Sequence, residues 1–325
     1  MSADSQKLLF IVGPTAVGKS KIAVETAKQI KGEIIGCDSM QIYRGLDICT
    51  AKPTPEERQT VPYHLIDFVD RNKEFTVNDW RQKALEIIPD IISRKGVPII
   101  TGGTGLYYRS LVYGLFPAPG ADWGLRETLM QQARVEGEKS LYERLKEVDK
   151  DSAAKINPND TRRIIRALEI YYLSGQTKTE LSSKTEGLPP EYCPVAVGLT
   201  SKRDKLYKRI KQRFDQMWDM GLVEEIKALN ENDLSRTVLQ MIGYKEIKGY
   251  LNGTYSEDEA KMLLVRNTRR LAKRQLSLFR QDENIDWIEI NPEKIDSKGE
   301  YIGEIVNKIR TIYNKENIKE FVKNA

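Results

Sequence analysis

The most constraining feature of the sequence is an eight-residue motif near its start. Residues 13–20 read GPTAVGKS and fit the pattern G-x-x-x-x-G-K-[ST]. A run of apolar residues, 8–12, precedes the motif, and apolar residues recur at helical spacing over 22–30. In this strand–loop–helix context, the backbone N–H groups of the motif and the N-terminus of the helix form a binding site for an anion. The sequence therefore predicts a phosphate cradle, in which Lys19 adds a positive charge and the Ser20 hydroxyl suits Mg²⁺.

Composition excludes several other kinds of protein. The chain has 325 residues, of which 40% are hydrophobic and 30% are charged, and no apolar run approaches the length of a membrane span. The first residues lack a secretory signal pattern, and three cysteines with a single histidine argue against disulfides and structural zinc. The formal net charge of +5 does not by itself identify a nucleic-acid partner. We expect a globular protein of the cytoplasm with no membrane contact.

Alternating apolar runs and helical patterns predict an α/β fold with a P-loop NTPase-like parallel sheet. Beyond residues 8–12, the expected strands are 33–37, 63–69, 97–101, 194–199 and 286–290. The expected long helices are 76–91, with Pro89 as a possible break, 204–230, 256–280 and 298–313. The chain is expected to leave this sheet and to rejoin it at the strand 194–199, so the sheet belongs to one core domain with an insertion.

That excursion begins where the sequence changes character, at the Pro-Ala-Pro-Gly stretch of 117–120. The following segment is polar and helical, and it includes a helix capped by the turn 157–160 that runs to Ser174 before Gly175. We expect a discontinuous core domain of residues 1–117 and 193–313, a helical insertion of 118–192 and a polar tail of 314–325.

Asp38 is the strongest candidate for chemistry outside the phosphate cradle. It follows the expected strand 33–37, at the sheet edge where ligands bind in open α/β folds. Its carboxylate fits three roles: a ligand of Mg²⁺, a general base, or a cap of the strand end. Gln41, three residues later, carries an amide that both donates and accepts, and so suits the edge of a base.

Basic residues lie on two helical faces. Arg162, Arg163 and Arg166 share one helix of the insertion, and a second helix carries Arg266, Arg269, Arg270, Lys273 and Arg274. Each face is either a phosphate-binding surface or a solvated helix side, and the pair favours a polyanionic partner. Arg213 stands beside the core face of a third helix, where it either reaches into a site or extends along the surface.

Seven blocks of the sequence together resemble the tRNA dimethylallyltransferases, the isopentenyltransferases of tRNA modification. They are GPTAVGKS (13–20), DSMQIYRGLDICTAKP (38–53), GGTGLY (102–107), NPNDTRRIIRALE (157–169), RFDQMWDMGLVEEI (213–226), IGYKEI (242–247) and RNTRRLAKRQLSLFR (266–280). The resemblance spans nearly residues 8–290. It implies a P-loop fold with a helical insertion that helps to grip the tRNA anticodon arm. No zinc-finger tail like that of eukaryotic members is present, which implies the bacterial type.

The resemblance implies transfer of a dimethylallyl group from dimethylallyl diphosphate to N6 of the adenosine 3′ of the anticodon. It assigns catalysis to Lys19, Asp38, Thr104 and Arg213 and Mg²⁺ binding to Ser20. The diphosphate would be held by Gly13, Thr15, Ala16, Val17, Gly18, Lys19 and Ser20. The tRNA would be contacted by Asp38, Ser39, Met40, Gln41, Thr104, Arg126, Arg162, Arg163, Ile164, Ile165 and Arg166. We expect a monomer.

Three other functions stay open from the residues alone. Two are enzymes: a P-loop kinase of small molecules, and an isopentenyltransferase acting on free adenine nucleotides. The third is a nucleotide-switched RNA-binding module without chemistry, and ATP binding by the P-loop is also left open. The expected strand 97–101 ends in Thr-Gly-Gly rather than an aspartate, which disfavours the kinase. Two basic helical faces exceed what a free nucleotide needs.

Overall fold

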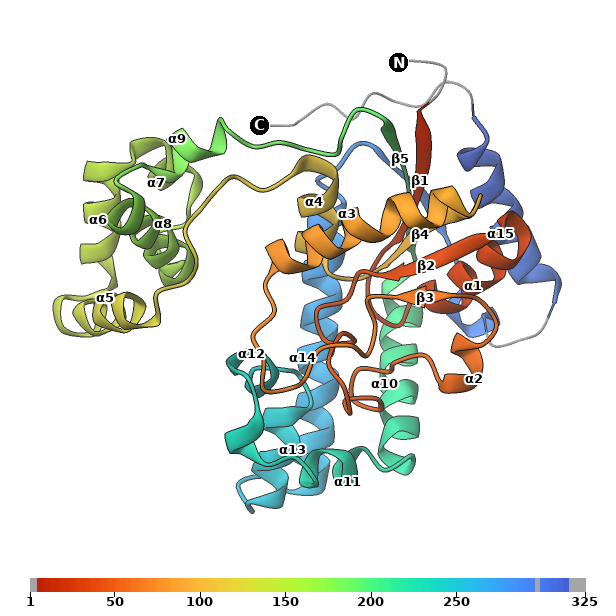
Figure 1. Cartoon of the computed structure of the whole chain (residues 1–325). Helices are drawn as coiled ribbons and strands as arrows, with labels where there is room; N and C mark the ends of the chain where they lie inside the picture. Colours follow the sequence, from red (N-terminus) through yellow and green to blue (C-terminus); the bar gives the residue numbers. More distant parts are fainter. Residues whose placement is uncertain (1–4, 296–298, 316–325) are drawn as a thin grey trace. The chain divides into compact units, whose positions relative to one another are not determined.

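A single six-stranded parallel sheet organises the protein, seen in the computed structural model (Figure 1). The structure describes residues 5–295 and 299–315, apart from the side chain of Glu138. The strand order is β3-β2-β4-β1-β5-β6. The strands are β1 Gln6–Val12, β2 Gly32–Gly36, β3 Tyr63–His64, β4 Val97–Gly102, β5 Tyr192–Thr200 and β6 Ile285–Glu289. The predicted P-loop NTPase-like α/β class is confirmed.

The central strand explains why the apolar runs of the sequence do not alternate with polar residues. β1 pairs with β4 through Leu9 and Ile99, and with β5 through Leu9 and Val195. Residues Leu8–Val12 are fully buried, because helices cover both faces of a parallel sheet. The chain places β2, β3 and β4 on one side of β1 and then β5 and β6 on the other. The loops after β1, β2 and β4 therefore meet at the carboxyl edge, where such sheets bind ligands.

The α-helices before residue 114 and after residue 200 are α1 Lys19–Ile30, α2 Pro55–Arg58, α3 Val77–Ser93, α4 Gly105–Tyr113, α10 Arg203–Asp219, α11 Leu222–Lys227, α12 Arg236–Leu239, α13 Tyr244–Leu251, α14 Glu257–Phe279 and α15 Glu300–Tyr313. A capping box formed by Thr76 and Asp79 begins α3, and Ser256 caps α14. Part of the predicted last helix, residue 298, lies outside the described residues, as does the tail after residue 315.

Two local expectations were wrong, and the possible break at Pro89 does not occur. The segment 63–69 is a strand only at Tyr63–His64, because Leu65 and Asp67 adopt positive φ angles of 55° and 56° that turn the chain. The predicted helix 204–230 divides at Gly221, whose φ of 97° ends one helix and starts the next. Pro89 lies inside α3 without dividing it.

The chain separates into two compact units, and each is described by itself. One combines Met1–Ser110 with Pro189–Ala325, and the other is Leu111–Leu188. The second unit holds α5 Trp123–Glu136, α6 Glu138–Val148, α7 Lys150–Lys155, α8 Thr161–Ser174 and α9 Lys178–Ser182. These helices enclose their own apolar core. Asp160 caps the start of α8, and Gly175, at a φ of 69°, ends it as predicted.

Over 5–295 and 299–315, no helix has both the length and the apolar character that crossing a bilayer requires.

Candidate functional site

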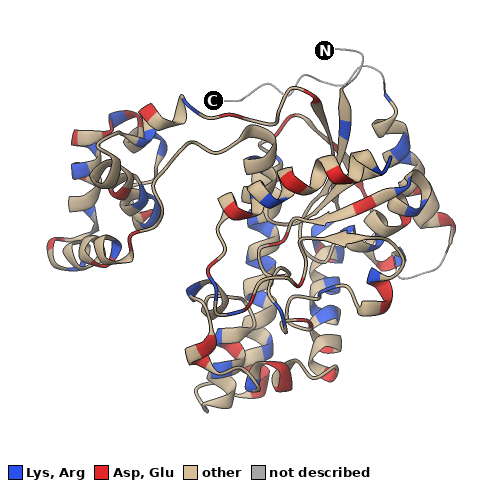
Figure 2. Cartoon of the chain, viewed as in Figure 1, with Lys and Arg blue, Asp and Glu red and all other residues tan. Residues whose placement is uncertain are grey.

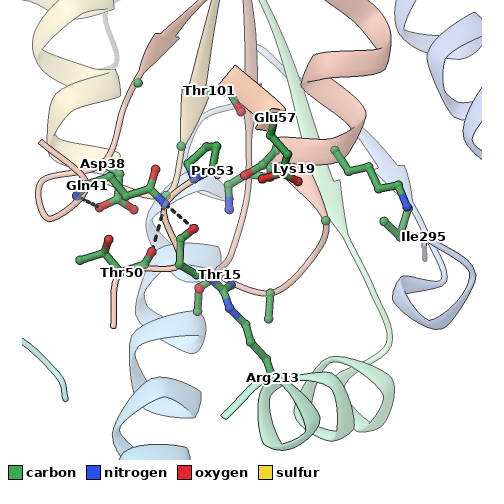
Figure 3. Close-up of a pocket in the computed structure, with 18 of the residues that line it drawn as sticks. Thr15, Lys19, Asp38, Gln41, Thr50, Pro53, Glu57, Thr101, Arg213 and Ile295 are labelled. Carbon is green, nitrogen blue, oxygen red and sulfur yellow. Dashed lines mark hydrogen bonds between the residues drawn. The ribbon is translucent and has the colours of Figure 1, made fainter. Parts of the chain in front are cut away.

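A cavity of about 810 Å³ opens at the carboxyl edge of the sheet, within the larger unit (Figure 3). Its walls come from the P-loop, the turns after β2 and β4, the loop 50–53, α10 and α14. Lys19, Asp38 and Arg213 line this single space, so the sheet brings together three of the four predicted catalytic residues. The fourth, Thr104, hydrogen-bonds to the backbone on either side of Asp38.

The P-loop has a backbone that only particular residues allow. Gly13 has a φ of 147°, and a Cβ there would lie 2.4 Å from the Leu199 carbonyl oxygen. Gly18 has a φ of 103° and forms the N-terminal cap of α1, so Lys19 and Ser20 occupy the first turn of that helix. The positive end of the helix dipole therefore faces the cavity. This is the local structure that the motif predicts, and it suits a diphosphate.

Two basic side chains face this cradle in surroundings of low polarity. Lys19 Nζ donates to the Pro14 carbonyl at 2.8 Å, and Arg213 reaches from α10 toward Thr15 (Figure 3). Burial lowers the pKa of Lys19 to about 8, with the Arg213 charge lowering it further and the Asp38 charge opposing the change. Burial also lowers the pKa of Arg213, again opposed by Asp38. Of the two interpretations of Arg213, the structure places its side chain in the cavity.

Asp38 has one oxygen committed to the fold. Its Oδ1 accepts the backbone N–H groups of Met40, at 2.9 Å, and Gln41, at 3.3 Å. Among the described residues, no donor bonds to Oδ2. Asp38 is thus a cap of the turn, as one interpretation held, and it keeps a carboxylate oxygen for a proton. The part of the chain that the structure describes holds no group of three or more acidic, His or Cys side chains placed for a metal ion. The Mg²⁺-ligand role of Asp38 stays a prediction.

Thr104 ties the turn after β4 to the turn after β2. Its Oγ1 accepts the Ser39 N–H at 3.0 Å, and its own N–H donates to the Cys37 carbonyl at 3.1 Å. The approach is close, because a Cβ on Gly102 would lie 1.9 Å from that carbonyl oxygen. Thr104 therefore fixes the backbone that carries Asp38. Burial raises the pKa of the Cys37 thiol, which disfavours its reactive thiolate form.

The Gln41 side chain can contact a base only as a hydrogen-bond acceptor. Its Nε2 donates to the Thr50 and Ala51 carbonyls at 3.0 and 3.1 Å, so both amide protons are used within the fold. Only Oε1 remains for a ligand, and Gln41 reads a base as an acceptor rather than as both donor and acceptor. Met40 packs against an apolar cluster at the edge of this loop.

In the smaller unit, several residues predicted to contact tRNA have structural partners instead. Arg126 makes two bonds to Glu169, Nε to Oε1 at 2.8 Å and Nη2 to Oε2 at 2.9 Å, and Arg166 binds the same carboxylate. The Glu169 side chain is fully buried. Ile164 and Ile165 are also in the core, at 1% and 4% exposure, so contact with tRNA through their side chains was a wrong expectation.

The remaining arginines of α8 are accessible. Arg162 is exposed, and Arg163 is 71% exposed beside Asp160, with 3.3 Å between Nε and Oδ2. These two arginines are the best candidates of this helix for phosphates. Basic residues recur along α14 (Figure 2). Four residues of the predicted stripe are exposed: Arg266, Arg270, Lys273 and Arg274. Arg269 does not belong to that stripe, because its guanidinium stacks 4.9 Å from the centre of the Tyr207 ring and its Nε is buried.

Sequence reasoning missed Gln275 of α14. Its Oε1 accepts the Thr15 N–H at 2.8 Å, and its amide nitrogen lies against Gly103. It therefore joins the P-loop to the turn after β4 and takes one N–H of the predicted cradle. A polar residue in a basic helix gives no sequence signal of such a contact, because its partner lies 260 positions away.

Comparisons with known proteins agree with this geometry. The family model described as IPP transferase matches residues 41–282, and one described as Isopentenyl transferase matches 6–74. The tRNA dimethylallyltransferase of Geobacter sulfurreducens is 46% identical over 91% of this chain and 96% of its own. That of Halothermothrix orenii is 44% identical over 89% of each chain.

Solved structures lead to the same family. The tRNA isopentenylpyrophosphate transferase of Bacillus halodurans superposes with a TM-score of 0.67 at 41% identity, over 95% of this chain and 97% of its own. A eukaryotic dimethylallyltransferase acting on tRNA gives 0.75 at 26% identity, over 98% and 82%.

Proposed function

The chain belongs to the tRNA dimethylallyltransferase family, and we propose that it moves a dimethylallyl group from dimethylallyl diphosphate to N6 of the adenosine 3′ of the anticodon. It is a prenyltransferase that modifies tRNA. The observation that carries the detailed proposal is the cavity itself. Two partly buried cations, Lys19 and Arg213, share it with the carboxylate of Asp38.

The donor diphosphate fits the P-loop side of the cavity. As the allylic C–O bond breaks, negative charge grows on the departing diphosphate. The first turn of α1 and the Lys19 and Arg213 side chains are already fixed around that position, so little reorganisation is needed when the charge appears. The P-loop thus serves as the site of a leaving group, with no hydrolysis of ATP in the reaction.

The acceptor base fits the Asp38 side. The adenine amine is a weak nucleophile, because its lone pair is delocalised into the ring. As N6 forms its bond to carbon, it loses one proton, which Asp38 Oδ2 is free to accept. The electron pair of the C–O bond leaves with the diphosphate, so the step balances without another reactant. The base must be unstacked from the anticodon loop to enter this cavity.

Mg²⁺ is part of the proposal as an ion that arrives with the diphosphate. The donor set fits that role: Ser20 supplies one hydroxyl beside the cradle, and Mg²⁺ in phosphate sites takes its other ligands from phosphate oxygens and water. When bound, the ion neutralises part of the diphosphate charge.

The smaller unit is proposed to hold the anticodon stem-loop through Arg162 and Arg163 of α8, which are exposed and basic. We also propose that the protein acts as a monomer. The tRNA substrate supports action in the cytoplasm.

A transfer assay tests the proposal. Purified protein is incubated with dimethylallyl diphosphate and either unmodified tRNA, its anticodon stem-loop, AMP or ATP, and products are identified by mass spectrometry after nuclease digestion. We expect a mass gain of one dimethylallyl group on the adenosine 3′ of the anticodon. Prenylation of AMP alone, or phosphoryl transfer from ATP without prenylation of RNA, would contradict the proposal.

A further inference from the structure

Glu225 lies outside the cavity, but it holds a loop whose residues Thr50 and Ala51 line it. Glu225 of α11 accepts three consecutive backbone N–H groups of the loop that follows Leu46. Its Oε2 lies 2.8 Å from the Asp47 nitrogen and 2.7 Å from that of Ile48, and its Oε1 lies 2.9 Å from that of Cys49. Hydrogen bonds to an ionised acceptor are among the strong ones in proteins. Glu225 therefore fixes this stretch of backbone in one conformation.

The other side of the same loop is held by a buried lysine. The Lys52 side chain is fully buried, and its Nζ donates to the Tyr43 carbonyl at 2.8 Å. It also bonds to Asp47 Oδ1 at 2.6 Å and to Asp67 Oδ1 at 2.7 Å. The loop 47–51 lies between these two anchors.

The loop ends in the two carbonyls that bind Gln41. The Gln41 amide nitrogen donates to the Thr50 carbonyl oxygen at 3.0 Å and to the Ala51 carbonyl oxygen at 3.1 Å. Figure 3 shows Gln41 beside Thr50. The opposite amide orientation would put Oε1 against two acceptors, so it is excluded while the loop keeps its shape. Gln41 lines the cavity, and within the described part of the chain its Oε1 has no donor.

We propose that Glu225 is a positioning residue for base selection. By holding the loop 47–51 it fixes Gln41 with its carbonyl oxygen available to the acceptor base, which favours an exocyclic amine over a carbonyl at that position. The inference rests on the proposed function. It goes beyond it by naming the group that reads the base and the distant residue that orients that group.

The chemistry of the amine explains the advantage. An exocyclic amine has two protons, of which one leaves during transfer and one stays on nitrogen. Asp38 Oδ2 takes the first, and Gln41 Oε1 accepts a hydrogen bond from the second. A base with a carbonyl in this place, such as hypoxanthine, would set its oxygen against both acceptors and leave them unpaired.

Binding of modified RNA tests the proposal without requiring turnover. Anticodon stem-loops carry adenosine, purine riboside or inosine at the position 3′ of the anticodon, and affinities are measured by fluorescence anisotropy without donor. For the unaltered protein we expect the order adenosine, purine riboside, inosine. In Gln41→Leu, the preference for adenosine over inosine should fall about tenfold, the scale of one hydrogen bond to a buried partner.

Glu225→Ala should reduce the same preference, and Glu224→Ala, an exposed neighbour on the same helix, should not. In the double variant of Gln41 and Glu225, the losses should not add, because both act on one contact. If either variant weakens all three RNAs equally, the role is structural and the proposal is wrong. An unaltered protein that prenylates tRNA but binds inosine and adenosine stem-loops alike would overturn the inference and leave the proposed function intact.

Discussion

The lowered pKa of Lys19 predicts how use of the donor depends on pH. Burial of the ammonium, with Arg213 nearby, brings the pKa of Lys19 to about 8 in the free protein. Only the protonated form stabilises a diphosphate, so the productive fraction falls as pH rises through this value. The fraction is about nine-tenths at pH 7, one-half at pH 8 and one-tenth at pH 9.

The matching assay is kcat/KM for dimethylallyl diphosphate at saturating stem-loop, because this parameter reports ionisations of the free enzyme. We expect it to fall about tenfold from pH 7 to pH 9, in proportion to the protonated fraction of Lys19. Binding of the donor should also take up about half a proton at pH 8, measured by calorimetry in buffers of different ionisation enthalpy.

Lys19→Arg is the matched control, since a guanidinium stays charged over this range. Its residual kcat/KM should not change between pH 7 and pH 9. A flat profile for the unaltered protein up to pH 9.5 would refute the reasoning. It would mean that Lys19 keeps the pKa of a solvated lysine and that the cavity is not a site of low polarity.

Three further substitutions give separate tests. Lys19→Ala should cost at least about 2–3 kcal/mol in transition-state stabilisation, seen in kcat/KM, and near-normal activity would end the P-loop interpretation. Arg166→Ala should lower the free energy of unfolding, measured by urea denaturation, by about 1–3 kcal/mol, because it removes a partner of a buried carboxylate. An unchanged urea midpoint would mean that Arg126 alone satisfies Glu169. Arg163→Ala should leave stability within about 0.5 kcal/mol and raise KM for tRNA, and the slope of its salt dependence should become shallower by about 0.7–0.9 for each phosphate that Arg163 neutralises. An unchanged KM and slope would make Arg163 a solvated residue.

Local signals made the main elements of the fold predictable. The glycines of the P-loop, the apolar central strands and the cap at Asp160 act over a few residues, and the structure places them as expected. Where a single backbone angle decided the outcome, prediction failed, as at Gly221, which divides a helical pattern that otherwise continues.

Contacts between distant parts of the chain could not be predicted from one sequence. The pairing of Arg166 with buried Glu169 gives a structural role to a residue that was expected to contact RNA. The bonds from Gln275 to Thr15 and from Glu225 to the loop 47–49 join positions more than 170 residues apart. Such partners are chosen by the packed fold, so only coordinates identify them.

The central claim is that Asp38 accepts a proton in the cavity where the P-loop holds the leaving diphosphate. Asp38→Asn tests it most directly, because the amide oxygen can still cap the turn at Met40 while the basic oxygen is lost. Single-turnover transfer is measured with donor and stem-loop both saturating, beside the affinity for the stem-loop. We expect nearly unchanged affinity and a rate about 10²–10⁴-fold lower. A variant that loses affinity for RNA but keeps its rate per bound complex would contradict the claim and make Asp38 a recognition residue.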